Sequence, residues 1–158
     1  MSRILINSAG RRVELVNIWK QSARNLFGVS AKVFANDSNP SLSAACQVAD
    51  DYFKVCSCTD PLYTQQLLDL CLVHGIRLVV PTIDTELIAL AEARSLFHES
   101  GIHLIISDRS LIKRCRDKRL TAELFKSLSI STPAILDPSD LTFPCFMKPV
   151  GGSCSQGI

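Results

Sequence analysis

The sequence predicts an α/β protein in which a parallel β-sheet carries helices on both faces. Strand-like apolar runs alternate with longer segments of helical periodicity, in the order β-α-β-β-α-β-α-β. This order favours parallel pairing through crossover helices. The segment at residues 77–81 shows no polar alternation, which is typical of a strand buried on both faces. At 158 residues, the chain is long enough to bury a core of its own.

The elements follow in order from the N-terminus. An apolar run at residues 3–7 predicts the first strand, and a helical pattern opens at Gly10 and extends to Gly28. Further strands are expected at residues 32–37, 51–55, 77–81 and 102–106, and helices at 40–46, 60–74 and 84–100. Asp60 and Asp84 are suitable N-caps for the two longer helices. Gly75 and Gly101 are suitable residues to end them.

The character of the chain changes after Ser107. A basic stretch at residues 109–119 precedes a predicted helix at 117–128, and a proline-punctuated stretch leads to a predicted strand at 145–150. We therefore expect two domains, covering residues 1–112 and 113–158.

Composition excludes several classes of protein. The net charge of +2 gives no general signal for nucleic-acid or membrane binding, and no apolar run is long enough to span a bilayer. The N-terminus lacks the apolar core of a secretory signal, so we expect a cytoplasmic protein. The seven cysteines follow no disulfide framework and are expected to be thiols. Neither they nor the three histidines show the spacing of a metal site.

The C-terminal segment has the composition of a phosphate-binding loop. Lys148 lies on the predicted strand, and a glycine- and serine-rich stretch follows the strand. Its candidate ligand-binding residues are Gly151, Gly152, Ser153, Ser155 and Gly157. Glycines let backbone N–H groups approach a phosphate, and a lysine adds a point charge. A flexible hairpin tip is the alternative interpretation. Lys118, in the first turn of the predicted helix, is a second candidate phosphate ligand, or part of a solvated basic face.

Polar residues also follow the predicted strands of the first domain, at the edge where open parallel sheets bind ligands. Gly10 and Arg11 follow the first strand, Asp37 ends the second, and Asp84 and Glu86 follow the fourth. Arg11 or Arg12 would hold a carboxylate or phosphate. The alternatives are structural: Gly10 and Asp37 as turn residues, the arginine as an exposed helix start, and Asp84 as an N-cap.

The order of these motifs resembles the N-terminal part of an ATP-grasp ligase, up to the start of its ATP-grasp domain. The similar enzymes are the carbamoyl-phosphate-synthase-like and biotin-carboxylase-like carboxylate–amine ligases. The stretches that carry the resemblance are residues 4–12, 35–37, 49–51, 80–87, 117–133 and 145–157. The resemblance implies a Rossmann-like (pre-ATP-grasp) domain followed by an incomplete start of the nucleotide-binding domain. It implies that Lys118 and Lys148 contact ATP phosphates, that the glycine-rich loop closes over ATP, and that Glu86 faces the substrate cleft.

The resemblance also implies an ATP-dependent carboxylate–amine (or thiol) ligase that works through an acyl phosphate on a small carboxylate substrate. The acidic ligands for Mg²⁺ lie beyond the glycine-rich loop in that superfamily, so we expect a chain that is inactive alone and contains no catalytic residue. The alternative is a non-catalytic binding or partner subunit, with a second chain or a homodimer covering the C-terminal segment. A nicotinamide-dependent enzyme is the weakest hypothesis, because the glycine fingerprint is missing.

Overall fold

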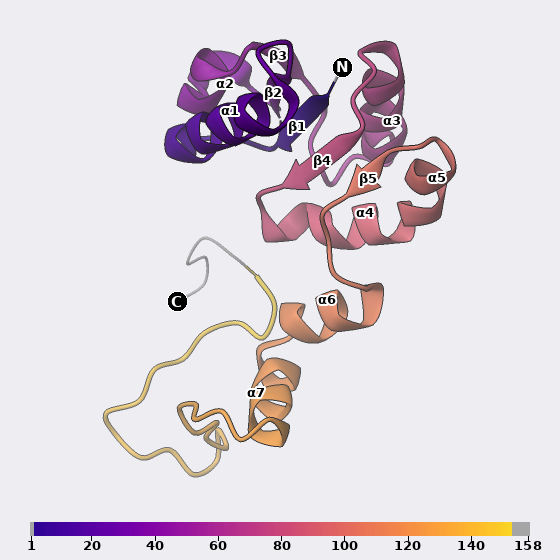
Figure 1. Ribbon diagram of the computed structural model, residues 1–158. Helices are drawn as coiled ribbons and strands as arrows, with labels where there is room; N and C mark the ends of the chain where they lie inside the picture. Colours follow the sequence, from indigo (N-terminus) through magenta and orange to yellow (C-terminus); the bar gives the residue numbers. More distant parts are fainter. Residues whose placement is uncertain (1, 153–158) are drawn as a thin grey trace. The chain divides into compact units, whose positions relative to one another are not determined.

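The computed structural model describes residues 2–152 (Figure 1). It divides the chain into two compact units, Met1–Ile106 and Ser107–Ile158, which we call the sheet unit and the C-terminal unit. The expected domain boundary at residue 112 falls within the helix α6 (Arg109–Arg116).

A five-stranded parallel sheet organises the sheet unit, which confirms the predicted fold class. Its strands are β1 (Arg3–Asn7), β2 (Lys32–Asp37), β3 (Asp51–Lys54), β4 (Leu78–Pro81) and β5 (His103–Leu104). They lie in the order β3-β2-β1-β4-β5, and every pair is parallel. The chain therefore builds outward from β1 to β3 and then returns to the other side of β1 with β4. Open α/β sheets bind ligands at such a switch point.

Helices cover both faces of the sheet. One face packs against α1 (Val13–Phe27) and α2 (Ala44–Val48), and the other against α3 (Tyr63–Val73), α4 (Leu87–Glu92) and α5 (Arg94–Glu99). The alternation of β1 explains this arrangement, since successive side chains of a strand point to opposite faces. Ile4 and Ile6 belong to the α1/α2 core, and Leu5 belongs to the α3–α5 core.

Three of the predicted helices differ from those observed. The helix expected at residues 60–74 begins only at Tyr63, because the Asp60 carboxylate accepts a hydrogen bond from the Leu62 N–H (2.8 Å) in a turn before the helix. The helix expected at 84–100 consists of a 3₁₀ turn, η2 (Asp84–Glu86), followed by α4 and α5 with a break at Ala93. The helix expected at 40–46 is likewise a 3₁₀ turn, η1 (Pro40–Leu42), and then α2.

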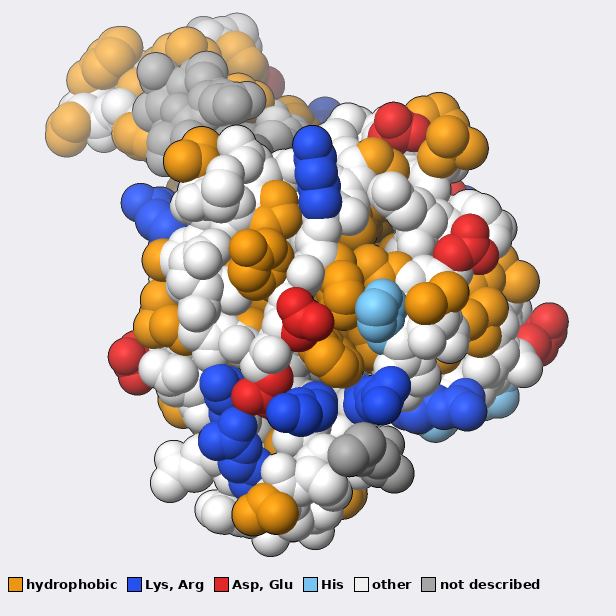
Figure 2. All heavy atoms as spheres, turned by 90° about the horizontal axis from the view of Figure 1, so that it is seen from above, with side chains coloured by type: hydrophobic (Ala, Val, Ile, Leu, Met, Phe, Trp, Pro, Cys, Tyr) orange, Lys and Arg blue, Asp and Glu red, His pale blue; other side chains and the backbone are white. Residues whose placement is uncertain are grey.

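Basic residues at the amino edge of the sheet cap helix ends. The guanidinium of Arg3, at the start of β1, donates to the carbonyl oxygen of His74 after α3. Arg77, just before β4, donates to the carbonyl of Ser100 after α5 (3.2 Å). Cations are favourable at helix C-termini, where carbonyl groups lack partners. Seen from above, several Lys and Arg side chains form a band along one side of this face, next to a patch of hydrophobic side chains (Figure 2).

The C-terminal unit contains α6 and α7 (Lys118–Ser127). The helix predicted at residues 117–128 is α7, with Asp117 as its N-cap, but α6 was not anticipated. The strand predicted at residues 145–150 is wrong: this segment is exposed and irregular. A strand requires a neighbour for its N–H and C=O groups, and the described part of this unit contains none. Within residues 2–152, no helix is long and apolar enough to cross a membrane.

Candidate functional site

The carboxyl edge of the sheet carries a connected group of buried polar side chains. Asn7 ends β1, Asn36 lies near the end of β2, and Glu86 ends the 3₁₀ turn that follows β4. All three side chains are buried, although buried polar groups are costly unless each finds a partner. Here, every buried side-chain nitrogen and oxygen among the described residues has one.

The Glu86 carboxylate is the centre of this network. Its Oε2 accepts from three side chains: Asn7 Nδ2 (2.6 Å), Ser8 Oγ (2.6 Å) and Tyr63 OH (2.8 Å). Its Oε1 accepts from the backbone N–H groups of Thr82 (2.8 Å) and Ile83 (3.3 Å). Burial, and then the charge of Glu86, raise the pKa of the Tyr63 phenol far above its ordinary value, so Tyr63 keeps the proton that it donates.

A second set of contacts joins the loop after β1 to the loop after β2. Asn36 Oδ1 accepts from the Ser8 N–H (2.8 Å), and Asp37 Oδ2 accepts from the Gly10 N–H (3.1 Å). Asp37 Oδ1 also accepts from the Asn39 N–H (3.0 Å). Asn36 and Asp37 therefore both hold neighbouring loops in place. For Asp37, this is the role of a turn residue, which the sequence offered as the alternative to ligand binding.

The loop after β1 has left-handed backbone at two positions. Gly10 has φ +55°, a conformation that glycine adopts without the penalty of a Cβ. Ser8 has φ +51°, which is uncommon for a residue with a side chain. The bonds to Asn36 and Glu86 hold Ser8 in this conformation. Such backbone is often found at ligand sites, where the surrounding structure compensates its cost.

A pocket of about 270 Å³ opens at this edge, which we call the edge pocket. Its lining residues come from the ends of β1, β2 and β3 and from the turn after β4. They are Ser8, Gly10, Arg12, Asp37, Ser38, Val55, Cys56, Ser57, Cys58 and Ile83. An arginine, a carboxylate and several hydroxyl and thiol groups thus share a single concave site.

The structure brings together only some of the residues predicted from the sequence. Gly10 and Asp37 line the edge pocket, whereas Arg11 and Asp84 are not among its lining residues. Arg12 lines it in place of Arg11. Glu86 is fully buried and contacts the pocket through Ser8 rather than directly.

Ser8 and the two cysteines Cys56 and Cys58 line the pocket although the sequence did not point to them. All of them follow strands that end at this edge, so the rule that selected Gly10 and Asp37 would also have selected them. The cysteines of the described residues are free thiols, as expected. Burial raises the pKa of the Cys56 thiol, so the uncharged form is favoured.

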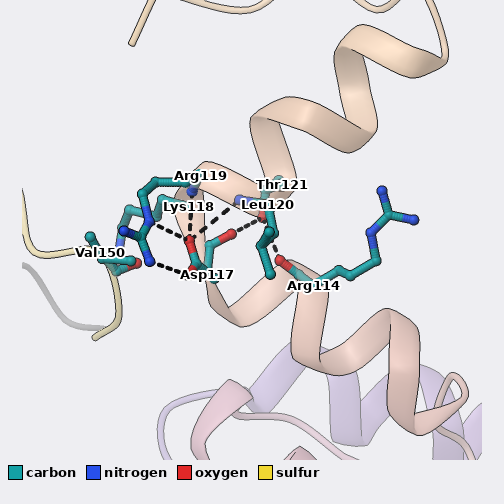
Figure 3. A network of polar contacts seen from close by, with 7 residues as sticks. All are labelled: Arg114, Asp117, Lys118, Arg119, Leu120, Thr121 and Val150. Carbon is teal, nitrogen blue, oxygen red and sulfur yellow. Dashed lines mark hydrogen bonds and ion pairs between the residues drawn. The ribbon is translucent and has the colours of Figure 1, made fainter. Parts of the chain in front are cut away.

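The second candidate region lies in the C-terminal unit, at the start of α7. Asp117 Oδ1 accepts from the N–H groups of Arg119 (2.8 Å) and Leu120 (3.3 Å), and its Oδ2 pairs with the Arg119 guanidinium (2.9 Å). The hydrogen bond from the Arg119 side chain lowers the pKa of the Asp117 carboxyl to about 2. Figure 3 shows this network, in which Thr121 Oγ also donates to the carbonyl of Arg114 in α6.

Lys118 connects the start of α7 to the segment that contains the first glycines of the loop. Its backbone N–H donates to the carbonyl of Val150 (3.1 Å), and its ammonium lies 3.3 Å from that oxygen and 3.4 Å from the carbonyl of Gly152. Lys148 and Gly151, which are close to Val150 in the sequence, are both exposed. Ser153, Ser155 and Gly157 lie outside the described residues.

Comparison with known families identifies the sheet unit. The model of the PylC-like, N-terminal domain matches residues 4–105, which is most of that unit. The chain belongs to the PylC-like N-terminal domain family. This membership confirms the resemblance to the pre-ATP-grasp part of ATP-grasp ligases. No curated protein sequence matches this PylC-like chain.

Solved structures share the fold of the PylC-like chain. The biotin carboxylase domain of a single-chain bacterial carboxylase has a TM-score of 0.58 at 19% identity, covering 91% of this chain and 32% of that one. The biotin carboxylase domain of Hydrogenobacter thermophilus 2-oxoglutarate carboxylase has a TM-score of 0.53 at 22% identity, covering 83% of this chain and 28% of that one. Rhizobium etli pyruvate carboxylase has a TM-score of 0.56 at 17% identity, covering 85% of this chain and 13% of that one. The chain therefore spans about a third or less of these proteins.

Proposed function

We propose that this chain is the N-terminal portion of an ATP-dependent carboxylate–amine (or thiol) ligase that works through an acyl phosphate. The observation that carries the proposal is the contact of Lys118 with Val150 and Gly152. It joins the two segments that the resemblance assigns to ATP. The family of the sheet unit and its shared fold with biotin carboxylase domains support the same proposal. The structure of the Hydrogenobacter thermophilus domain contains MgADP and bicarbonate.

The residues of the C-terminal unit have the chemistry to hold ATP. Lys118 and Lys148 would offset phosphate charge, and the amides of Gly151 and Gly152 are unshielded by side chains. Among the described residues, the hydrogen bonds of the Lys118 ammonium go to two carbonyl oxygens, at 3.3 and 3.4 Å. A phosphate offers stronger, charge-assisted hydrogen bonds. When bound, ATP supplies the phosphoryl group that activates the carboxylate.

The edge pocket is the proposed site for the small carboxylate. The exposed Arg12 is the cation in its lining, and an arginine binds carboxylates through two parallel hydrogen bonds. Arg11, the other arginine that the sequence offered, is the natural control because it is also exposed but does not line the pocket.

The residues present do not fit Mg²⁺. Among residues 2–152, no group of three or more His, Cys, Asp or Glu side chains is placed to hold a metal ion. We therefore expect no turnover from these 158 residues alone.

Calorimetric titration of the full chain with ATP tests the proposal. The Lys118→Ala variant is expected to bind ATP about tenfold more weakly, because a charge-assisted hydrogen bond contributes roughly 1.5–3 kcal/mol. Lys126→Ala, in the last turn of the same helix, is the matched control and should bind like the parent. If the parent does not bind ATP, or if both variants bind it equally, the ATP-site assignment is wrong.

A partner subunit of a split ATP-grasp enzyme is the second candidate function. Large apolar side chains of the C-terminal segment are strongly exposed, among them Phe143 (77%), Phe146 (70%) and Met147 (84%). Such surfaces are typical of interaction sites. Light scattering at micromolar concentration distinguishes the candidates: a stable homodimer that ATP does not affect favours the partner subunit, with a second copy covering this segment.

A further inference from the structure

Ser8 and Asp37 are adjacent in the edge pocket because of the register of the sheet. Ile6 of β1 pairs with Ala35 of β2, so Ser8 and Asp37, which each lie two residues further along the chain, come side by side. Both line the pocket and both are partly exposed. The hydrogen bonds that each already makes therefore determine what it can offer to a ligand.

The proton of the Ser8 hydroxyl is committed. A buried carboxylate can only accept hydrogen bonds, so the 2.6 Å contact between Ser8 Oγ and Glu86 Oε2 uses the hydroxyl proton. The Ser8 N–H is also used, by Asn36 Oδ1 at 2.8 Å. Tyr63 and Asn7 supply the remaining donors to Glu86 Oε2 from within the protein. What remains at Ser8 Oγ is its lone pairs.

Asp37 offers acceptors as well. Its carboxylate accepts from the N–H groups of Gly10 (3.1 Å) and Asn39 (3.0 Å). The Ser38 hydroxyl makes a third, longer contact with it (3.5 Å). An ionised carboxylate has about four lone-pair positions, so it keeps capacity for a further donor. Ser8 and Asp37 therefore form an acceptor-rich wall, whereas Arg12 in the same pocket is a donor.

We infer that Ser8 is a ligand-binding residue whose hydroxyl acts only as a hydrogen-bond acceptor, and that the wall formed by Ser8 and Asp37 binds a primary ammonium group of the ligand. Glu86 is a positioning residue: it acts on the ligand by fixing the direction of the Ser8 hydroxyl. The inference deepens the proposed function, since it rests on the edge pocket being the substrate site.

The test uses small probes and the ¹⁵N-labelled full chain. Ethylammonium chloride and sodium acetate are titrated separately at equal ionic strength, and the amide signals of Gly10, Cys56 and Ser57 are followed by NMR. Saturable shifts with ethylammonium are expected. Shifts that saturate with acetate but not with ethylammonium would overturn the inference.

Variants identify the residue responsible. Ser8→Ala is expected to weaken ethylammonium binding about tenfold, as for a hydrogen bond to a charged group. Ser22→Ala should change it less than twofold, because Ser22 is exposed in α1 and is not among the lining residues of the pocket. Equal binding by Ser8→Ala and the parent would contradict the assignment.

The role of Glu86 has a separate readout. In Glu86→Gln, an amide replaces the carboxylate and can donate to Ser8 Oγ, which frees the serine proton for the pocket. The ratio of ethylammonium to acetate affinity should then fall, which a purely structural role does not predict. If Glu86→Gln does not fold, Ser8→Ala alone decides.

Lys118→Ala separates this inference from the proposed function. It should leave the ethylammonium shifts unchanged while weakening ATP binding. Ethylammonium binding without any ATP binding by the parent would refute the ATP assignment and leave the Ser8 assignment standing.

Discussion

Glu86 in the sheet unit and Asp117 in the C-terminal unit are carboxylates in similar local positions with different surroundings. Each accepts hydrogen bonds from two backbone N–H groups near the start of a helix or 3₁₀ turn. Glu86 is fully buried and joins three further side chains, whereas Asp117 adds only the exposed Arg119. The same local capping pattern is therefore expected to matter for the whole fold only where it is buried, because water can replace the carboxylate as hydrogen-bond acceptor at an exposed position.

The largest effect is expected from removing the buried carboxylate. Glu86→Ala leaves buried donors of Asn7, Ser8 and Tyr63 without an acceptor, and each such group costs about 1–3 kcal/mol. We expect the free energy of unfolding to fall by at least about 3 kcal/mol. Urea unfolding followed by fluorescence of Trp19, the single tryptophan, measures it. Glu99→Ala, exposed in α5, is the control. Equal midpoints for the two variants would refute the central role of Glu86.

Asp50 sharpens the comparison, because it is buried and also paired with cations. Its side chain is 7% exposed and contacts Lys20 (3.2 Å) and Arg24 (2.9 Å). Burial alone would raise the pKa of its carboxyl, but the hydrogen bond from the Val33 N–H, together with Lys20, lowers it. A carboxyl with a lowered folded-state pKa stabilises the fold fully above its unfolded pKa of about 4. That contribution is lost as the pH falls through the folded-state pKa.

We therefore expect Asp50→Asn to lower the stability of the sheet unit by about 2 kcal/mol at pH 7 and by less as the pH falls below about 4. Urea midpoints at pH 7 and at about pH 3 measure this difference. Asp51→Asn, at the exposed neighbouring position, should show neither effect. A constant difference between parent and Asp50→Asn across this range would contradict the role of the charge.

Gly10→Ala tests the backbone of the pocket. A Cβ in the left-handed region costs about 1–2 kcal/mol, and it would also lie about 3.5 Å from the Arg12 guanidinium. We expect a loss of that size in stability and an altered edge pocket. Gly151→Ala in the C-terminal unit has open space around the added carbon and should leave the Trp19 transition unchanged. An unchanged stability for Gly10→Ala would show that the loop adopts another conformation.

The sequence predicted the sheet unit far better than the C-terminal unit. Parallel strands such as β4 are determined by local apolar runs, and their order follows from the crossover rules. The strand predicted at residues 145–150 depended on a pairing partner that no local pattern reports. In the candidate site, Gly10 and Asp37 could be predicted as pocket residues because they lie where parallel strands end. The burial of Glu86 depended on Asn7, Ser8 and Tyr63, which lie up to 79 residues away in the chain.

Asp117→Ala should have the smallest effect on the whole molecule, although it removes a cap of the same kind as Glu86 provides. Water replaces the lost acceptor at this exposed site, so only the first turn of α7 is expected to loosen. Hydrogen exchange of the Arg119 and Leu120 amides should accelerate, while the Trp19 transition stays at the parent midpoint. Asp140→Ala, in the exposed segment after α7, is the control. Because the pKa of Asp117 is about 2, the slow exchange in the parent should persist to about pH 3. A shifted Trp19 midpoint would show that burial is not what separates the two carboxylates.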